Sequence, residues 1–178
     1  ETTALPQANS HLEQLLHQPY GTLSAALSTY CGQNLGAGEM ERIRQGFRKS
    51  LVIMGIFSLV MLPVMQFCST GIVSIFVDDP EVIYYGARAL EITSWFYLFL
   101  GIINMARGIL NGVGDALFAL INGGVEVVIR IFLPVAMTGI AFIGVWGIWW
   151  ATGLSWLISA LFCVWRYASW KKKHFRYG

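Results

Sequence analysis

Long uninterrupted stretches of apolar residues dominate the chain after residue 50. The two longest runs without a charged residue, 50–77 and 131–165, each exceed the roughly 20 apolar residues that a helix needs to cross a bilayer. Within them, segments such as SLVIMGIFSLVML are apolar on every face, whereas strands of a membrane barrel alternate between apolar and polar positions. Because backbone polar groups must be satisfied internally in lipid, the pattern predicts an all-α, polytopic membrane protein.

Polar interruptions divide the chain into segments. Residues 1–20 are polar and contain two prolines, so we expect an exposed or poorly ordered lead-in. The complete set of predicted segments is a polar lead-in at 1–20, the end of a helix and a glycine-rich loop at 21–38, a basic cytoplasmic loop at 39–49, spans at 50–77, 84–112, 117–141 and 145–168, and a basic cytoplasmic tail at 169–178. This gives four complete transmembrane helices plus the end of a fifth.

The division of the last apolar run follows from its length. Residues 131–165 are too many for one span and too few for two, which need about 40 residues. The motif FIGVWGIWW at 142–150 combines glycines with aromatic residues, which is typical of a tight turn at the membrane interface. The third span must therefore begin near Phe118, and it carries Glu126 and Arg130 into the membrane region.

Charge distribution predicts the orientation. The two densest basic clusters, within 42–49 and 166–176, flank four predicted spans, so an even number of crossings places them on the same side. The positive-inside rule makes that side cytoplasmic, together with the C-terminus. The acidic turn at 78–81 then lies outside.

Composition excludes several classes of function. Hydrophobic residues make up 56% of the chain and charged residues 12%, and a net charge of +2 is too small to indicate binding to nucleic acid. The cysteines at 31, 68 and 163 lack the paired spacing of a disulfide framework or a metal site. The chain contains no G-x-S-x-G or H-E-x-x-H motif, so we expect neither an enzyme nor a metal centre.

Three of the charged residues within the predicted spans form the main candidate site. Glu126 and Arg130 are four residues apart in the favourable order for a pair on one helix, and Arg107 on the preceding span is a candidate third member. One hypothesis is a structural charge network that locks the cytoplasmic ends of the helices together. The other is that Glu126 exchanges protons or sodium ions.

Other residues within the spans are weaker candidates. We predict that Trp95, Phe96, Asn104 and Trp156 line a substrate cavity. Two prolines at mid-span, Pro63 and Pro134, free backbone carbonyls and permit bending, which is expected of a transporter but also occurs in static bundles.

Several motifs together resemble a known family. The segments STYCGQNLGAGEMERIRQGFRKS, RGILNGVGD, GGVEVVIR and GVWGIWWATGLSWLISAL, in this order, are similar to the C-terminal part of a multidrug and toxic compound extrusion (MATE) transporter. The resemblance covers about residues 24–173. It implies a multi-pass protein of the cell membrane, plasma or bacterial inner, that exports small organic cations or amphipathic drugs by alternating access between two six-helix bundles, driven by sodium or proton flow and without a cofactor. This chain would correspond to the end of the eighth helix and to the ninth to twelfth helices.

The chain departs from the family pattern in two ways. The N-terminal bundle is missing, so we interpret the chain as a truncated or split product whose partners are membrane lipid and either the missing bundle or a second copy. Some members carry a cation-binding carboxylate midway along the tenth helix, but residues 96–105 contain no acid, which leaves Glu126 as the coupling-ion candidate.

Two alternative functions stay open. The first is a non-transporting membrane remnant or interaction protein that dimerises through small-residue faces, at Gly108 and Gly112 or at Gly123 and Gly124. The second is a lipid-linked precursor flippase with a similar bundle, whose cavity would be expected to be more cationic.

Overall fold

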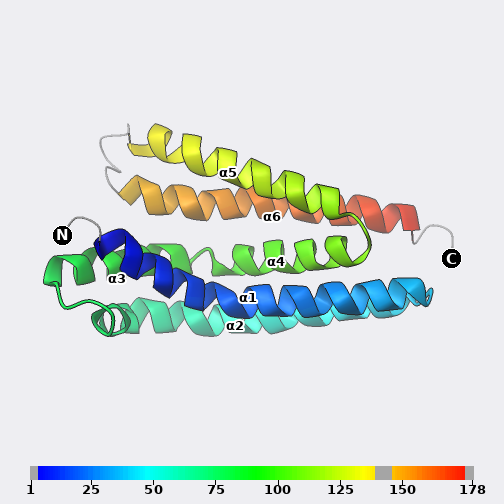
Figure 1. The fold of residues 1–178 in the computed structure, drawn as a ribbon, viewed down its shortest axis with the longest axis horizontal. Helices are drawn as coiled ribbons and strands as arrows, with labels where there is room; N and C mark the ends of the chain where they lie inside the picture. The colour runs from blue at the N-terminus through cyan, green and yellow to red at the C-terminus, as the bar shows by residue number, and fades with distance from the viewer. Residues whose placement is uncertain (1–3, 139–145, 175–178) are drawn as a thin grey trace.

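The fold is an elongated bundle of α-helices. A computed structural model describes residues 4–138 and 146–174, with side chains at 14, 17–136 and 146–172. These residues contain six helices and no strand. The helices are α1 (Ala4–Gly36), α2 (Met40–Ser74), α3 (Pro80–Ser94), α4 (Tyr97–Gly112), α5 (Ala116–Thr138) and α6 (Gly147–His174). In Figure 1 the described chain starts at one end of the bundle and finishes at the other.

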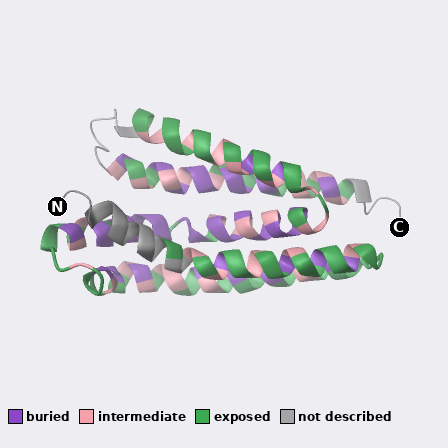
Figure 2. Cartoon of the chain, in the orientation of Figure 1, coloured by how far each residue is buried: buried purple, intermediate pink, exposed green. Residues whose placement is uncertain are grey.

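Helix α4 is the centre of the bundle. It contacts α1, α2, α5 and α6, and most of its residues are buried (Figure 2).

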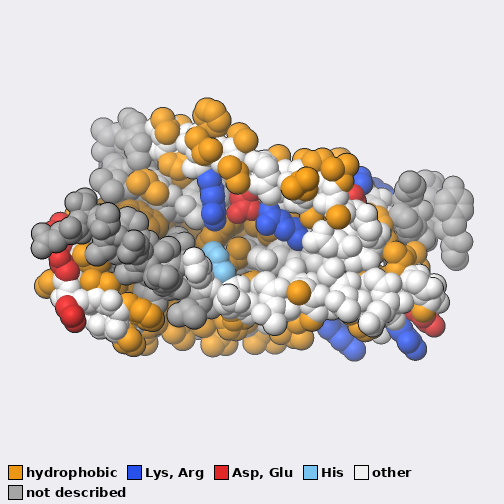
Figure 3. Space-filling view, viewed as in Figure 1, with side chains coloured by type: hydrophobic (Ala, Val, Ile, Leu, Met, Phe, Trp, Pro, Cys, Tyr) orange, Lys and Arg blue, Asp and Glu red, His pale blue; other side chains and the backbone are white. Residues whose placement is uncertain are grey.

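The outer faces of the bundle are apolar. Large hydrophobic side chains are exposed along α2 and α5, and Figure 3 shows hydrophobic surface along both edges of the molecule. Helices α2, α5 and α6 are each long and apolar enough to cross a membrane, and α3 with α4 makes a fourth candidate span if the bent pair is counted as one. Apolar side chains facing outward are stable only in lipid or against another apolar surface. The prediction of an all-α polytopic membrane protein is confirmed.

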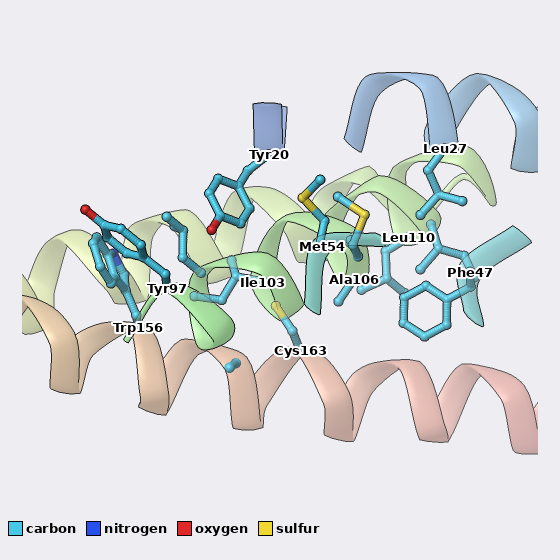
Figure 4. Packing of buried hydrophobic residues seen from close by; sticks show 14 of the residues in the cluster. Tyr20, Leu27, Phe47, Met54, Tyr97, Ile103, Ala106, Leu110, Trp156 and Cys163 are labelled. Atoms are coloured by element: carbon cyan, nitrogen blue, oxygen red, sulfur yellow. The ribbon is translucent and has the colours of Figure 1, made fainter. Parts of the chain in front are cut away.

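Side chains from four helices interlock in the core. Ile103, Ala106 and Leu110 of α4 lie among Tyr20 and Leu27 of α1, Met54 and Phe47 of α2, and Trp156 and Cys163 of α6 (Figure 4). All of these side chains are buried.

The N-terminal segment is helical from residue 4 onward, where the sequence predicted an exposed or poorly ordered lead-in at 1–20. Gln14 and Gln18 are exposed, but the segment ends on a buried residue, Tyr20. Helix α1 runs through Pro19, although a proline inside a helix costs about 3 kcal/mol. Packing compensates for this cost, because Tyr20 is only 1% exposed and its hydroxyl lies 3.0 Å from the Ser58 hydroxyl of α2. Helix α1 also continues through most of the glycine-rich stretch predicted as a loop at 32–38.

The basic stretch at 39–49 is helical as well, so the predicted loop there was wrong. Helix α2 begins at Met40, and its first turns bury Ile43 and Phe47, which are four residues apart on one face. The basic side chains occupy the remaining faces of the same turns. The predicted basic tail is likewise helical as far as His174.

Two tight turns close the same end of the bundle. Gly38 (φ 75°) follows α1 and Gly114 (φ 88°) follows α4, a left-handed conformation that glycine adopts readily. At both turns the next residue bonds back to the helix, Glu39 N–H to Asn34 at 2.8 Å and Asp115 N–H to Leu110 at 2.8 Å. The start of α2 and the end of α6 lie at this end, so both basic clusters share it (Figure 1).

The predicted continuous span at 84–112 is broken in two. Helices α3 and α4 meet at Trp95 and Phe96 with a bend of 61°. Polar side chains stabilise the break, because the freed carbonyl of Glu91 accepts from the Ser94 hydroxyl at 2.7 Å and from Gln66 Nε2 at 2.8 Å.

The mid-span prolines do not interrupt their helices. Pro63 lies inside α2 and Pro134 inside α5, and both helices continue past them.

The predicted turn at 142–150 falls only partly within the described chain. Residues 139–145 lie outside it, and residues 147–150 form the first turn of α6 rather than a loop.

The two pairs of small residues proposed for dimerisation have different surroundings. A Cβ at Gly108 would lie 2.7 Å from the Ser24 carbonyl oxygen of α1, and one at Gly112 would meet the Ser28 carbonyl. Gly108 and Gly112 are therefore used within the chain, where they allow α1 and α4 to approach closely. At Gly123 and Gly124 on α5, an added Cβ would meet no neighbouring atom within 4 Å, so this face is open.

Candidate functional site

The three intramembrane charges lie together between α4 and α5. Arg107 Nη2 is 2.6 Å from Glu126 Oε2, and Arg130 Nη2 is 3.6 Å from Glu126 Oε1. The Glu126 side chain is 15% exposed, that of Arg107 26% and that of Arg130 44%. Each carboxylate oxygen therefore faces a different guanidinium, and the closer contact comes from the neighbouring helix.

Asn122 lies on the same face of α5 as Glu126 and also contacts Arg107. With its carboxamide oxygen turned toward Arg107, Asn122 accepts from Nε at 3.1 Å and from Nη2 at 2.8 Å. Asn122 is fully buried and precedes Glu126 by one helical turn. The Arg107 guanidinium is thus held by two groups of α5.

The cluster lies midway along the bundle. Glu126 is near the middle of α5, and Arg130 is at least two turns from either end of that helix. Figure 3 shows charged side chains gathered midway along the face between α5 and α1, with the histidine beside them. We expected the charge network to lock the cytoplasmic ends of the helices, but it lies midway along α5 and not at the end of the bundle that carries the basic clusters.

Trp156 of α6 connects the cluster to α1. The Arg130 guanidinium carbon lies 5.8 Å from the centre of the Trp156 ring, within the range of a cation–π contact. The ring of His17 packs edge-on against the same indole at 5.6 Å between centroids. Trp156 therefore lies beneath the charged face, in contact with α1 and α5.

The other predicted cavity residues do not join this cluster. Trp95 is 58% exposed. Phe96 is buried, and its ring packs so closely on Gly153 of α6 that a Cβ at this glycine would clash with it. Asn104 donates from Nδ2 to the Leu100 carbonyl of its own helix at 2.9 Å. Of the four candidates, Trp156 is the one with a contact to a member of the cluster in the described structure, through Arg130.

A second arginine–carboxylate pair lies at the opposite end from the two basic clusters. Arg88 Nη1 is 2.6 Å from Glu91 Oε2, and both residues line an open groove of about 550 Å³ with Thr70 and Tyr84. The Ser69 hydroxyl donates to the other Glu91 oxygen at 3.3 Å. Both carboxylate oxygens of Glu91 are therefore engaged.

Two residues near the three charges were not predicted as members of the site. His17 lies in the polar segment at 1–20, which we expected to be exposed or poorly ordered, and the packing of α1 brings its ring to Trp156. Asn122 could have been found, because it shares a helical face with Glu126 at a spacing of four. Within the described residues, no three His, Cys, Asp or Glu side chains gather as metal ligands would.

Sequence comparison decides the family. The model of the MatE family matches residues 8–136, well over half of the chain. The chain belongs to the MatE family. This is a family of transporters rather than enzymes, which agrees with the bundle of apolar helices.

Individual MatE relatives are distant in sequence, and their names describe transport, extrusion or drug resistance. A probable multidrug resistance protein of Bacillus subtilis, YoeA, is 28% identical over 74% of this chain and 29% of its own length. The FAD transporter of Shewanella oneidensis is 27% identical over 88% of this chain and 34% of its own length. The human multidrug and toxin extrusion protein 1 is 28% identical over 71% of this chain and 22% of its own length. The chain thus spans about a fifth to a third of the length of these relatives.

Proposed function

We propose that this chain forms the C-terminal part of a cation-coupled efflux antiporter that exports amphipathic organic compounds, cationic ones included, by alternating access. The observation that carries the proposal is the Arg107–Glu126–Arg130 cluster, partly exposed midway along a membrane bundle. Ionisable groups at this depth cost roughly 2.5–3.5 kcal/mol each on insertion scales, so they mark a transport pathway more often than a surface. Membership in a transporter family supports the same conclusion.

Competition for one carboxylate provides a coupling mechanism. Glu126 holds Arg107 of α4 through the 2.6 Å contact, which ties the two helices together. A sodium ion or proton that reached Glu126 would compete with Arg107 for the carboxylate. Its arrival would loosen α4 from α5, and its departure would restore the pair. A carboxylate with two exchangeable partners can thus bias a bundle between two arrangements.

The proposal places the chain in the plasma membrane or bacterial inner membrane with the end that carries both basic clusters in the cytoplasm. The six helices of the described residues form one bundle, and alternating access in inverted-repeat or two-bundle transporters requires one bundle to move against another. The exposed apolar face of α5 is a suitable surface for lipid or for a second bundle. We therefore propose that transport requires a second bundle.

Ethidium efflux tests the proposed function directly. Cells lacking their own pumps would express this chain alone, or with the N-terminal bundle of a MatE relative, under an imposed sodium or proton gradient. We expect efflux only when both bundles are present and the gradient is imposed. Cells with the N-terminal bundle alone are the matched control.

Two outcomes would contradict parts of this proposal. Efflux by the chain alone would show that no separate bundle is required. If neither combination exported ethidium although the chain was correctly inserted, the result would contradict transport and favour a non-transporting interaction protein.

A further inference from the structure

The central cluster contains more positive than negative charge. Among the described residues that meet there, the two guanidinium groups of Arg107 and Arg130 face the single carboxylate of Glu126. Ionisable groups inside a membrane protein normally have partners, because an uncompensated charge is costly in lipid. The excess positive charge therefore needs a compensating group.

The excess is concentrated on Arg130. Arg107 is held at 2.6 Å by Glu126 and by the Asn122 oxygen at 2.8 Å and 3.1 Å. Arg130 approaches Glu126 only to 3.6 Å, and 44% of its side chain is exposed. An arginine has five N–H donors in a planar fork that matches the two oxygens of a carboxylate or phosphate. Arg130 is thus placed to bind a further acceptor.

Two buried polar groups of α6, one of them in the indole beneath Arg130, also lack a partner in the described part of the chain. Trp156, whose ring lies under the Arg130 guanidinium, is 1% exposed, and its Nε1 has no hydrogen-bond partner in the described part of the chain. The hydroxyl of Ser159, one turn further along α6 and fully buried, also has none there. An indole N–H can only donate, and most buried polar groups in proteins are paired. These observations are independent of the charge count and also favour an acceptor.

We infer that Arg130, with Trp156 beneath it, forms a subsite for an oxyanion, a carboxylate or phosphate, carried by the transported compound. The inference rests on the proposed transport function only in making the occupant a transported compound. A lipid phosphate has the same chemistry, but phospholipid headgroups lie at the membrane surfaces, and Arg130 is at least two turns from either end of α5. The favoured compounds are therefore amphipathic molecules that carry an anionic group, zwitterions included.

Riboflavin and riboflavin 5′-phosphate provide a matched pair of probes, because they share one fluorescent ring and differ only in the phosphate. The purified chain in nanodiscs of neutral lipid would be titrated with each probe, following flavin fluorescence. We expect the phosphate form to bind at least tenfold more tightly, because one hydrogen-bonded contact between charged groups contributes about this difference in affinity.

Three variants locate the effect. Arg130→Gln should bring the two affinities to within twofold of each other, and Arg130→Lys should retain part of the preference, since it keeps the charge but loses the fork. Arg130→Gln leaves the 2.6 Å pair between Arg107 and Glu126 in place, so we expect it to fold. Arg88→Gln, which removes the arginine of the Arg88–Glu91 pair, is the control and should keep the full preference.

Several results would overturn the inference. Equal affinities for the two probes in the unmodified chain would do so, as would a preference that survives in Arg130→Gln. If anionic lipid in the nanodiscs abolished the preference, the occupant would be a lipid phosphate and not a transported compound. Ethidium efflux without any phosphate preference would overturn this inference alone. A phosphate preference in a chain that exports nothing with its second bundle would contradict the proposed function and the transported occupant, but not the oxyanion subsite itself.

Discussion

Replacing Glu126 with glutamine is expected to destabilise the bundle and abolish efflux. The change leaves Arg107 and Arg130 without their shared carboxylate. Removing one partner of a fully buried ion pair typically costs about 3–5 kcal/mol, and because this cluster is partly exposed we expect a smaller loss of stability. The loss of stability is measured as the thermal midpoint in detergent, with size-exclusion chromatography as the readout. Ethidium efflux at matched levels of inserted protein measures the second effect.

The control for this prediction is Glu91→Gln, which removes the carboxylate of a second pair at the same 2.6 Å distance. Arg88 is 57% exposed, so the surroundings can solvate it after the change, and we expect a loss within about 1 kcal/mol. If Glu91→Gln destabilised the chain as strongly as Glu126→Gln, burial of the central cluster would not explain the effect.

A charge exchange separates the two roles of Glu126. Arg107 is a closer partner of Glu126 than Arg130 is, so the double variant should be Arg107→Glu with Glu126→Arg. We expect it to recover much of the lost stability, because opposite charges again face each other across α4 and α5. Efflux should stay absent, because the carboxylate has moved to the other helix. Full recovery of efflux would contradict a coupling role for the carboxylate of Glu126.

Gly108→Ala is expected to separate α1 from α4 and to lower stability by about 1–3 kcal/mol, as overpacking usually does. The added Cβ would lie 2.7 Å from the Ser24 carbonyl oxygen and 2.9 Å from its hydroxyl oxygen. A backbone carbonyl cannot rotate away, so α1 itself must move. The same movement would strain the 2.7 Å hydrogen bond from the Ser24 hydroxyl to the Asn104 carbonyl. The thermal midpoint in detergent is again the measurement.

Gly124→Ala is the matched control, because it makes the same substitution inside a neighbouring helix where no atom lies within 4 Å of the new Cβ. Alanine is favoured over glycine in a helix by about 1 kcal/mol, so this variant should be neutral or more stable. A Gly108→Ala variant as stable as Gly124→Ala would show that α1 does not pack against α4 at this position.

The helical class and the candidate spans could be predicted from sequence because their causes are local. A run of apolar residues in lipid must form a helix to satisfy its own backbone, whatever its neighbours are. The spacing of four between Glu126 and Arg130 likewise places them on one face of any helix. Four passes along the bundle separate the two basic clusters. Because the number of passes is even, the chain returns to the end at which it started, and the two clusters share that end.

Non-local contacts decided the rest. Helix α1 continues through Pro19 because Tyr20 and its neighbours pack on other helices, and the bend at Trp95 and Phe96 depends on Gln66, a residue of α2. Local propensity predicts the opposite at both places, a break at the proline and a continuous span at the bend.

The candidate site divides in the same way. The sequence by itself determined that Glu126 and Arg130 enter the membrane region on one helix. Only the tertiary structure decided that Arg107 is the closer partner of Glu126 and that Trp156 lies beneath Arg130. These contacts join residues of different helices, and their distances follow from how closely the helices pack, which no spacing along the chain encodes.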